Sequence, residues 1–204
     1  MDSRRAYLAG LGVVATASFT GCSGSGTPAT DGGSGTTDGG SETTGGPKRV
    51  DPTSTAFADG DRIPTRYTCD GAGASPPLAV DAPDRAATWA VVVTDPDAPG
   101  GTFTHWLVWN IPVRTDLPEG VPHGKTVPSL QGANQGKNGF GENGYGGMCP
   151  PAGDGAHTYR FSAYTLDGRL DVGADVDRPS LVDAIDANDP LSVGSIAATF
   201  SRTA

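Results

Sequence analysis

Three stretches of the chain carry the hydrophobic pattern of β-strands. Residues Thr88–Thr94 (TWAVVVT) and Thr104–Ile111 (THWLVWNI) are nearly unbroken runs of β-branched, aliphatic and aromatic side chains. Such runs predict strands that are buried on both faces. Residues His157–Leu166 instead alternate, so every second side chain from His157 to Ala163 faces the same way. The turn-forming segment 95–101, DPDAPGG, separates the first two strands.

Weaker patterns add shorter elements on either side of these strands. Short strands are predicted at Thr53–Phe57 and Arg62–Thr68, an extended segment at Leu78–Val80, and a last strand at Gly194–Phe200. Residues Thr115–Gly132 carry only turn signals and short extended pieces. The chain is therefore expected to be extended over most of its length.

A single helix is predicted near the C-terminus, at Pro179–Ala187. Proline suits the first turn of a helix, and Asp177 or Ser180 can cap it. Leu181 and Ile185 give the helix an apolar side. Many strands and turns with one late helix predict a mainly β domain of the sandwich or Greek-key type.

The N-terminus has the features of an export signal. SRRAYL at residues 3–8 is a twin-arginine pattern, and the apolar run Leu8–Ala17 is too short to span a bilayer. The sequence FTGC, which ends at Cys22, resembles a lipobox. We therefore expect a lipoprotein signal at residues 1–21 and a lipid anchor on Cys22. The alternative is a signal cut nearby, with Cys22 an ordinary free thiol.

A segment of low complexity follows Cys22. Residues 23–46 are rich in Gly, Ser and Thr and contain no large apolar side chain. Such a segment cannot bury enough surface to offset its ordering entropy, and it behaves as a flexible tether. Residues 22–49 are thus expected to link an anchor at the outer face of the cell membrane to a domain at 50–204. The alternative is a disordered leader with no role.

The charge of the chain excludes one class of partner. The formal net charge is −9, and twenty aspartates stand against three lysines. No basic stripe occurs, which argues against nucleic acid as a partner. An Asp-rich, Lys-poor surface resembles that of proteins adapted to high salt, where self-repulsion is screened. The alternative is simply an acidic, soluble domain.

Two further cysteines, Cys69 and Cys149, lie in the expected domain. An exported context and an even count permit a disulfide between them. The alternative is two buried free thiols. We favour the disulfide, because an exposed thiol persists poorly in an oxidising compartment.

Candidate chemistry gathers where the predicted strands meet loops rich in proline and glycine. Asp95 and Asp97 lie in the turn after the first strand, and His105 begins the second. His157 and Tyr159 share a face at the start of the alternating strand, after the glycine-rich segment 136–147. Each also has a structural explanation: an aspartate caps a turn, a histidine ends a strand, and a tyrosine packs in the core. Only three histidines occur in the chain, however, and two of them lie here.

These residues carry a resemblance to a known family. TDPDAP (94–99), HWLVWNIP (105–112) and NGFGENGYGGMCPP (138–151) with HTYRF (157–161) resemble the signature blocks of the phosphatidylethanolamine-binding protein family. YTCDG and SPPL, within residues 67–78, are similar to its bacterial and archaeal branch, often labelled Raf kinase inhibitor-like. The resemblance extends from Val50 to Arg202.

The resemblance implies a fold and a site. The family has an antiparallel Greek-key β-sandwich, a large sheet plus a smaller one, with a short C-terminal helix. It has a small pocket for phosphate-like anions, whose motif positions and rim fall here on Asp95, Asp97, His105, Gly147, Cys149, His157 and Tyr159. Cys149 replaces a glycine of animal members. Asn188-Asp189 stands where microbial relatives often have a histidine.

The residue types agree with an anion site. The two imidazoles, the Tyr159 hydroxyl and the amides near Gly146 and Gly147 are hydrogen-bond donors. Asp95 or Asp97 can accept from an imidazole and favour its charged form. We therefore expect a non-enzymatic protein that binds a small anionic or phosphorylated ligand, without a cofactor.

Two other functions stay open at this point. The first is an inhibitor of a kinase or hydrolase that acts through the same pocket, as the resemblance implies. The second is an enzyme, in which the aspartates and histidines hold a metal ion or act as acid and base in hydrolysis. The motifs contain no serine or cysteine nucleophile, which disfavours the enzyme.

Overall fold

The structure is a computed structural model that describes residues 46–204. The predicted signal, the lipid anchor at Cys22 and most of the tether lie outside the described residues. The first strand among the described residues is β1 (Lys48–Arg49), two residues long and just before the expected start of the domain.

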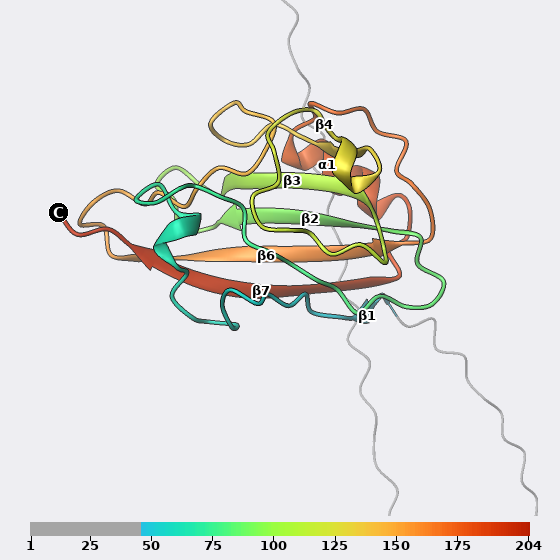
Figure 1. Cartoon of the computed structure of the whole chain (residues 1–204), viewed down its shortest axis with the longest axis horizontal. Helices are drawn as coiled ribbons and strands as arrows, with labels where there is room; N and C mark the ends of the chain where they lie inside the picture. The colour runs from blue at the N-terminus through green and yellow to red at the C-terminus, as the bar shows by residue number, and fades with distance from the viewer. Residues whose placement is uncertain (1–45) are drawn as a thin grey trace, which may run out of the picture. The chain divides into compact units, whose positions relative to one another are not determined.

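Four long strands form the centre of a sheet (Figure 1). They are β2 (Thr88–Asp95), β3 (Phe103–Pro112), β6 (Ala156–Leu166) and β7 (Ser192–Ser201). With β1, β4 (Thr126–Val127) and β5 (Ala133–Gln135) they make a seven-stranded sheet in the order β1-β7-β6-β2-β3-β5-β4. All neighbours are antiparallel except β1, which runs parallel to β7. The three strands with the clearest hydrophobic patterns are confirmed.

The central strands are buried on both faces, as their unbroken apolar runs predict. On one face, Trp89, Val91 and Val93 of β2 belong to the larger hydrophobic core. On the other, Ala90 and Val92 belong to a second core. Alternate side chains of a strand face opposite ways, so one apolar run serves both cores.

The C-terminal helix covers the second core. Helix α1 (Arg178–Asp186) buries Leu181 and Ile185 against β2 and β3 side chains. The Asp177 side chain caps it, accepting a hydrogen bond of 3.0 Å from the backbone amide of Ser180. The predicted helix is thus confirmed, one residue earlier at each end.

The prediction of short strands at Thr53–Phe57 and Arg62–Thr68 is wrong. Thr53 forms only an isolated bridge with Ala79, and residues 62–68 contain a bridge at Arg62 and the 3-10 helix η1 (Thr65–Tyr67). Pro64, before η1, lacks the amide that a strand ladder needs. Side chains compete for the backbone as well, because the Ser54 hydroxyl accepts a hydrogen bond from the nearby amide of Ala56.

The sequence also missed three small elements and one feature of the sheet. β4, β5 and the 3-10 helix η2 (Pro128–Leu130) lie in or beside Thr115–Gly132, where turns and short extended pieces were expected without definite elements, and each is too short for a periodic signal. Residues 46–204 contain a single sheet, which does not confirm the two-sheet Greek-key sandwich. Where a smaller sheet was expected there are isolated bridges, among them Leu78–Leu117.

Cys69 and Cys149 form a disulfide across 80 residues of sequence. It joins the loop after η1 to the segment before β6. The backbone supports the same junction, because the Cys69 amide donates to the Met148 carbonyl at 3.1 Å. The alternative of two free thiols therefore does not apply.

Candidate functional site

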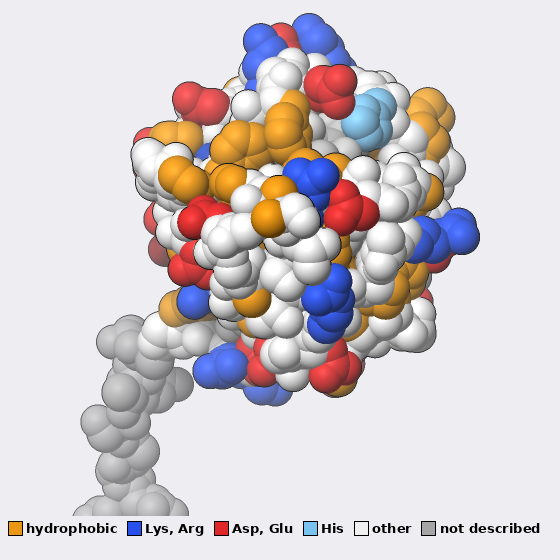
Figure 2. All heavy atoms as spheres, turned by 90° about the vertical axis from the view of Figure 1, so that its left-hand side faces the viewer, with side chains coloured by type: hydrophobic (Ala, Val, Ile, Leu, Met, Phe, Trp, Pro, Cys, Tyr) orange, Lys and Arg blue, Asp and Glu red, His pale blue; other side chains and the backbone are white. Residues whose placement is uncertain are grey.

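The antiparallel order of the sheet brings the candidate residues to one edge. Asp95 is the last residue of β2, and His105 and His157 lie near the starts of β3 and β6. β2 lies between β3 and β6 and runs opposite to both, so its end adjoins the beginnings of its neighbours. Figure 2 views this end of the sheet, where acidic, basic and hydrophobic side chains are mixed on the surface.

His157 and Asp95 form the best-defined pair of the site. The Nδ1–H of His157 donates to Oδ2 of Asp95 at 2.7 Å, and each side chain is only 4 % exposed. Burial alone would lower the pKa of His157, but the hydrogen bond and charge of Asp95 outweigh burial and raise that pKa. Asp95 thus orients the ring and favours its cationic form, the role predicted from the sequence.

The other nitrogen of His157 faces a residue that the sequence analysis missed. Oδ2 of Asp154 lies 3.4 Å from Nε2 of His157. The Asp154 side chain is 48 % exposed, in contrast to the buried imidazole. Asp154 also contributes to the raised pKa of His157. In the sequence, Asp154 is marked only by its position three residues before His157. An aspartate at that spacing from a histidine is common and does not indicate a site.

Tyr159 lies between the two imidazoles. Its ring stacks near His157, at 6.4 Å between centroids, and meets the His105 ring edge-on at 5.2 Å. Its hydroxyl is buried, and no acceptor among the described residues meets hydrogen-bond geometry with it. Burial raises the pKa of Tyr159, and the charge of Asp95 and the closeness of the Asp95 carboxylate to the hydroxyl raise it further, so the hydroxyl keeps its proton.

His105 differs chemically from what the sequence suggested. Its Nδ1 lies 2.8 Å from the carbonyl oxygen of Gly146, which can only accept, so Nδ1 carries the proton. Burial lowers the pKa of His105, and the Gly146 carbonyl offsets this only in part. The ring is therefore neutral at neutral pH and presents Nε2 as an acceptor. It is not the second donor that we expected.

Asp97 and the backbone amide of Gly146 are engaged in hydrogen bonds within the protein. The Asp97 carboxylate accepts from the backbone amide of Thr158 at 2.8 Å, and the Asp97 amide donates to Asp95 at 2.9 Å. Asp97 therefore ties the turn after β2 to the start of β6 and does not contact an imidazole. The Gly146 amide donates to the His105 carbonyl at 2.7 Å, so it is not free for a ligand.

Gly147 and Cys149 lie in the rim of the site, the glycine-rich loop before Pro150, and the disulfide starts from Cys149. They line a cleft of about 430 Å³ together with Cys69, Phe140 and Tyr145. A Cβ on Gly147 would approach backbone atoms of Thr68 and Cys69 to 3.0 and 3.1 Å, so a larger residue there would need the backbone to shift by a few tenths of an ångström. Phe140, 53 % exposed, packs edge-on against Phe103 and His105. Neither phenylalanine was singled out in the sequence.

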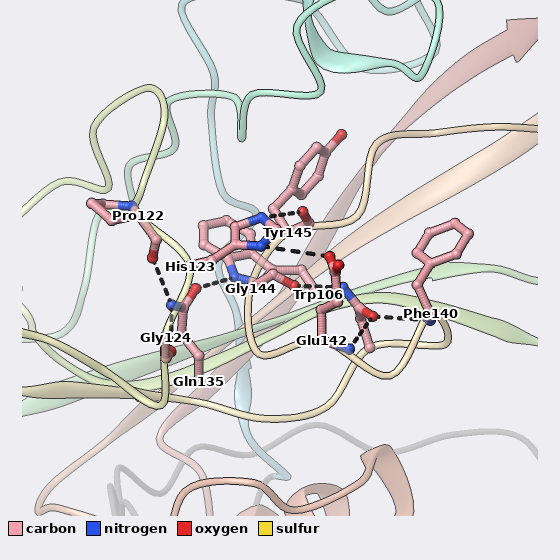
Figure 3. Close-up of polar contacts among 10 residues, drawn as sticks. Trp106, Pro122, His123, Gly124, Gln135, Phe140, Glu142, Gly144 and Tyr145 are labelled. Atoms are coloured by element: carbon pink, nitrogen blue, oxygen red, sulfur yellow. Dashed lines mark hydrogen bonds and ion pairs between the residues drawn. The ribbon is translucent and has the colours of Figure 1, made fainter.

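Polar contacts hold the glycine-rich rim in shape (Figure 3). The Asn138 side chain accepts from the amides of Phe140 and Glu142. His123 donates from Nε2 to the Tyr145 carbonyl at 2.9 Å and lies 3.6 Å from Glu142 through Nδ1 (Figure 3). The third histidine of the chain is therefore a surface residue that supports the rim.

The described part of the chain lacks two further features, a metal-binding cluster and a membrane-spanning helix. Within residues 46–204, no three His, Cys, Asp or Glu side chains are arranged to hold a metal ion. The same residues contain no helix of the length and apolarity needed to cross a membrane.

Comparisons with known proteins agree on one family. Residues 53–201 match the family model described as phosphatidylethanolamine-binding protein. A UPF0098 protein of Pyrococcus horikoshii is 39% identical over 150 residues, which cover 73% of this chain and 75% of that protein. LppC of Mycobacterium tuberculosis, named as a candidate lipoprotein, is 38% identical over 79% of this chain and 80% of its own length. The crystal structure of Escherichia coli YbcL, described as a member of the mammalian PEBP family, has a TM-score of 0.67 and 32% identity, covering 75% of this chain and 98% of YbcL.

Proposed function

Because this chain belongs to the phosphatidylethanolamine-binding protein family, we propose that it binds an oxyanion between His157 and Tyr159. The ligand would be the phosphate group of a small molecule or of a lipid headgroup. The observation that carries the proposal is the Tyr159 hydroxyl, which is buried near the Asp95 carboxylate but makes no hydrogen bond of good geometry among the described residues. Such a group is costly unless it meets a ligand or water.

The surrounding charges support the same ligand class. Asp95 favours the imidazolium form of His157, whose Nε2–H is then a charged donor, and Tyr159 on the same strand offers a neutral one. The neutral His105 ring adds an acceptor, which suits an oxyanion that still carries a proton. The described residues offer no comparable support for the inhibitor or hydrolase hypotheses, and both stay predictions.

Access to the site involves its rim. His105 and His157 are each 3% exposed and Tyr159 is 0% exposed. An oxyanion can therefore reach the Tyr159 hydroxyl only when a rim residue moves aside, and Asp154 is the exposed side chain in contact with His157.

Binding is tested by the thermal stability of the protein with inorganic phosphate. Because a ligand stabilises the folded state that binds it, phosphate at about 100 times its Kd adds roughly 2.7 kcal/mol and raises Tm. His157→Ala is expected to abolish this gain. Lys48→Ala, at the exposed strand β1 beside the opposite end of β7, is the control and is expected to retain it. A wild type whose Tm does not respond to phosphate or a phosphomonoester contradicts the proposal.

We also propose that the domain is tethered to the outer face of the cell membrane through a lipid on Cys22. The lipobox-like FTGC sequence and the tether composition support this, as does the likeness to LppC. Fractionation of cells tests it, since a tethered protein is recovered with membranes and an untethered one is not.

A further inference from the structure

Asp154 occupies the one nitrogen of His157 that a ligand needs. Nδ1 is committed to Asp95 at 2.7 Å, which leaves Nε2 as the donor for an oxyanion. Oδ2 of Asp154 already lies at Nε2, at 3.4 Å. A carboxylate is itself an oxyanion, so this contact imitates the one proposed for the ligand.

The mimic is incomplete. Asp154 reaches His157 but leaves the Tyr159 hydroxyl without a partner among the described residues. Its distance from Nε2 is also longer than the roughly 2.7–2.9 Å of a strong charge-assisted hydrogen bond. Under the proposed function, an external oxyanion also accepts from the Tyr159 hydroxyl, a contact that the internal carboxylate does not make.

The backbone around Asp154 allows the side chain to leave. Gly153 and Gly155 flank it with φ of 84° and 93°, conformations that other residues rarely adopt. A Cβ on Gly155 would meet nothing within 4 Å, and one on Gly153 only Ala204 at 3.5 Å, so packing does not confine this segment. The Asp154 amide donates to the Pro151 carbonyl at 3.2 Å, which anchors the backbone but leaves the side chain free.

We propose that Asp154 is an internal competitor for the oxyanion site, so that a ligand binds by displacing its carboxylate from Nε2 of His157. This inference rests on the proposed function. It accounts for an otherwise unfavourable balance of charge, because two carboxylates, those of Asp95 and Asp154, contact a single cationic imidazole. If Asp154 stayed in place, an arriving anion would meet its negative charge at the donor.

Displacement also sets the selectivity of the site. A ligand with one acceptor oxygen exchanges one contact for another and gains little over Asp154. A phosphate group or similar oxyanion gains the Tyr159 hydroxyl in addition. Asp154 thereby disfavours weak or singly coordinating anions.

Calorimetric titration with inorganic phosphate tests this, using wild type, Asp154→Asn and Asp175→Asn. Asp154→Asn keeps the shape of the side chain but removes its charge, and is expected to lower the Kd roughly three- to tenfold. Asp175→Asn makes the same change in net charge at a carboxylate that pairs with Lys125, and is expected to leave the Kd unchanged. In the phosphate-free protein, Asp154→Asn is also expected to lower the pKa of His157 measured by NMR.

The outcomes separate the two claims. Binding to wild type with equal or weaker binding to Asp154→Asn overturns the competitor role and leaves the oxyanion site standing. Phosphate binding to neither protein overturns both. Binding only to Asp154→Asn supports the competitor in its strongest form. An unchanged pKa of His157 in Asp154→Asn counts against the contact itself.

Discussion

Replacing Cys69 and Cys149 together by serine is expected to lower the free energy of unfolding by about 4–5 kcal/mol. The disulfide closes a loop of 80 residues, and a long closed loop restricts the unfolded chain strongly. This is of the same order as the whole stability of many domains. Urea denaturation of wild type and of the double variant measures the difference.

Reduction provides the control for the disulfide prediction. A thiol reductant is expected to lower the stability of wild type to that of the double variant and to leave the double variant unaffected. Because the bond joins the rim to the loop after η1, the double variant should also bind phosphate more weakly. Equal stability of the oxidised wild type and the double variant would show that the bond does not constrain the fold.

Among single substitutions in the site, Asp95→Asn is expected to lower the free energy of unfolding the most. Breaking a buried charged pair by neutralising one partner costs about 3–5 kcal/mol, because the other is left without compensation. Asp95 and His157 are each 4 % exposed, so little solvent screens them. The amide side chain of this variant would still accept a hydrogen bond but would no longer favour the imidazolium form.

The loss of stability in Asp95→Asn is expected to depend on pH, and the titration of His157 determines whether it grows or shrinks as the pH rises. Its pKa is raised in the folded wild type, so its stabilisation is fully present below the unfolded value of about 6.5. That stabilisation is lost as the pH rises through the folded pKa. In Asp95→Asn, burial becomes the larger influence and lowers the pKa of His157. The difference between the two proteins should therefore be largest at acidic pH and shrink towards alkaline pH.

Asp97→Asn is the matched control for this change. Its carboxylate accepts from the Thr158 amide and does not contact an imidazole. We expect a loss of about 1 kcal/mol from the weaker hydrogen bond, with little change in the pH profile. Urea denaturation between about pH 5 and 8 measures all three proteins, since this range spans the titration of histidine. A loss in Asp95→Asn that does not vary with pH would contradict the assigned role of Asp95.

Long, regular patterns in the sequence predicted the central fold. The apolar runs of β2 and β3 and the alternation of β6 are each sustained over many residues, and α1 has a proper cap in Asp177. The first part of the domain was mispredicted because Pro64 and local side-chain bonds override a β-rich composition. Strands as short as β4 carry no period at all.

The part of the site that could be predicted from the sequence consists of residues whose type and position at a strand end indicate their role. The sequence left open which aspartate would accept from an imidazole, and it is Asp95 that pairs with His157, because the end of β2 adjoins the start of β6. The neutral state of His105 was not predictable, since it depends on the carbonyl of Gly146, 41 residues away. Asp154 was missed because an aspartate in a glycine-rich loop is common, and only the fold places it at Nε2 of His157.

The central claim is that the Tyr159 hydroxyl binds an oxyanion, and phosphate titration of two tyrosine variants tests it most directly. Tyr159→Phe removes a buried hydroxyl without a partner among the described residues, whereas Tyr145→Phe removes one that donates to the Tyr67 carbonyl at 2.8 Å. We expect phosphate affinity to fall about five- to tenfold in Tyr159→Phe, consistent with one hydrogen bond of about 1–1.4 kcal/mol, and to be retained in Tyr145→Phe. Without phosphate, Tyr145→Phe should be the less stable variant. Undiminished phosphate binding by Tyr159→Phe would contradict the account.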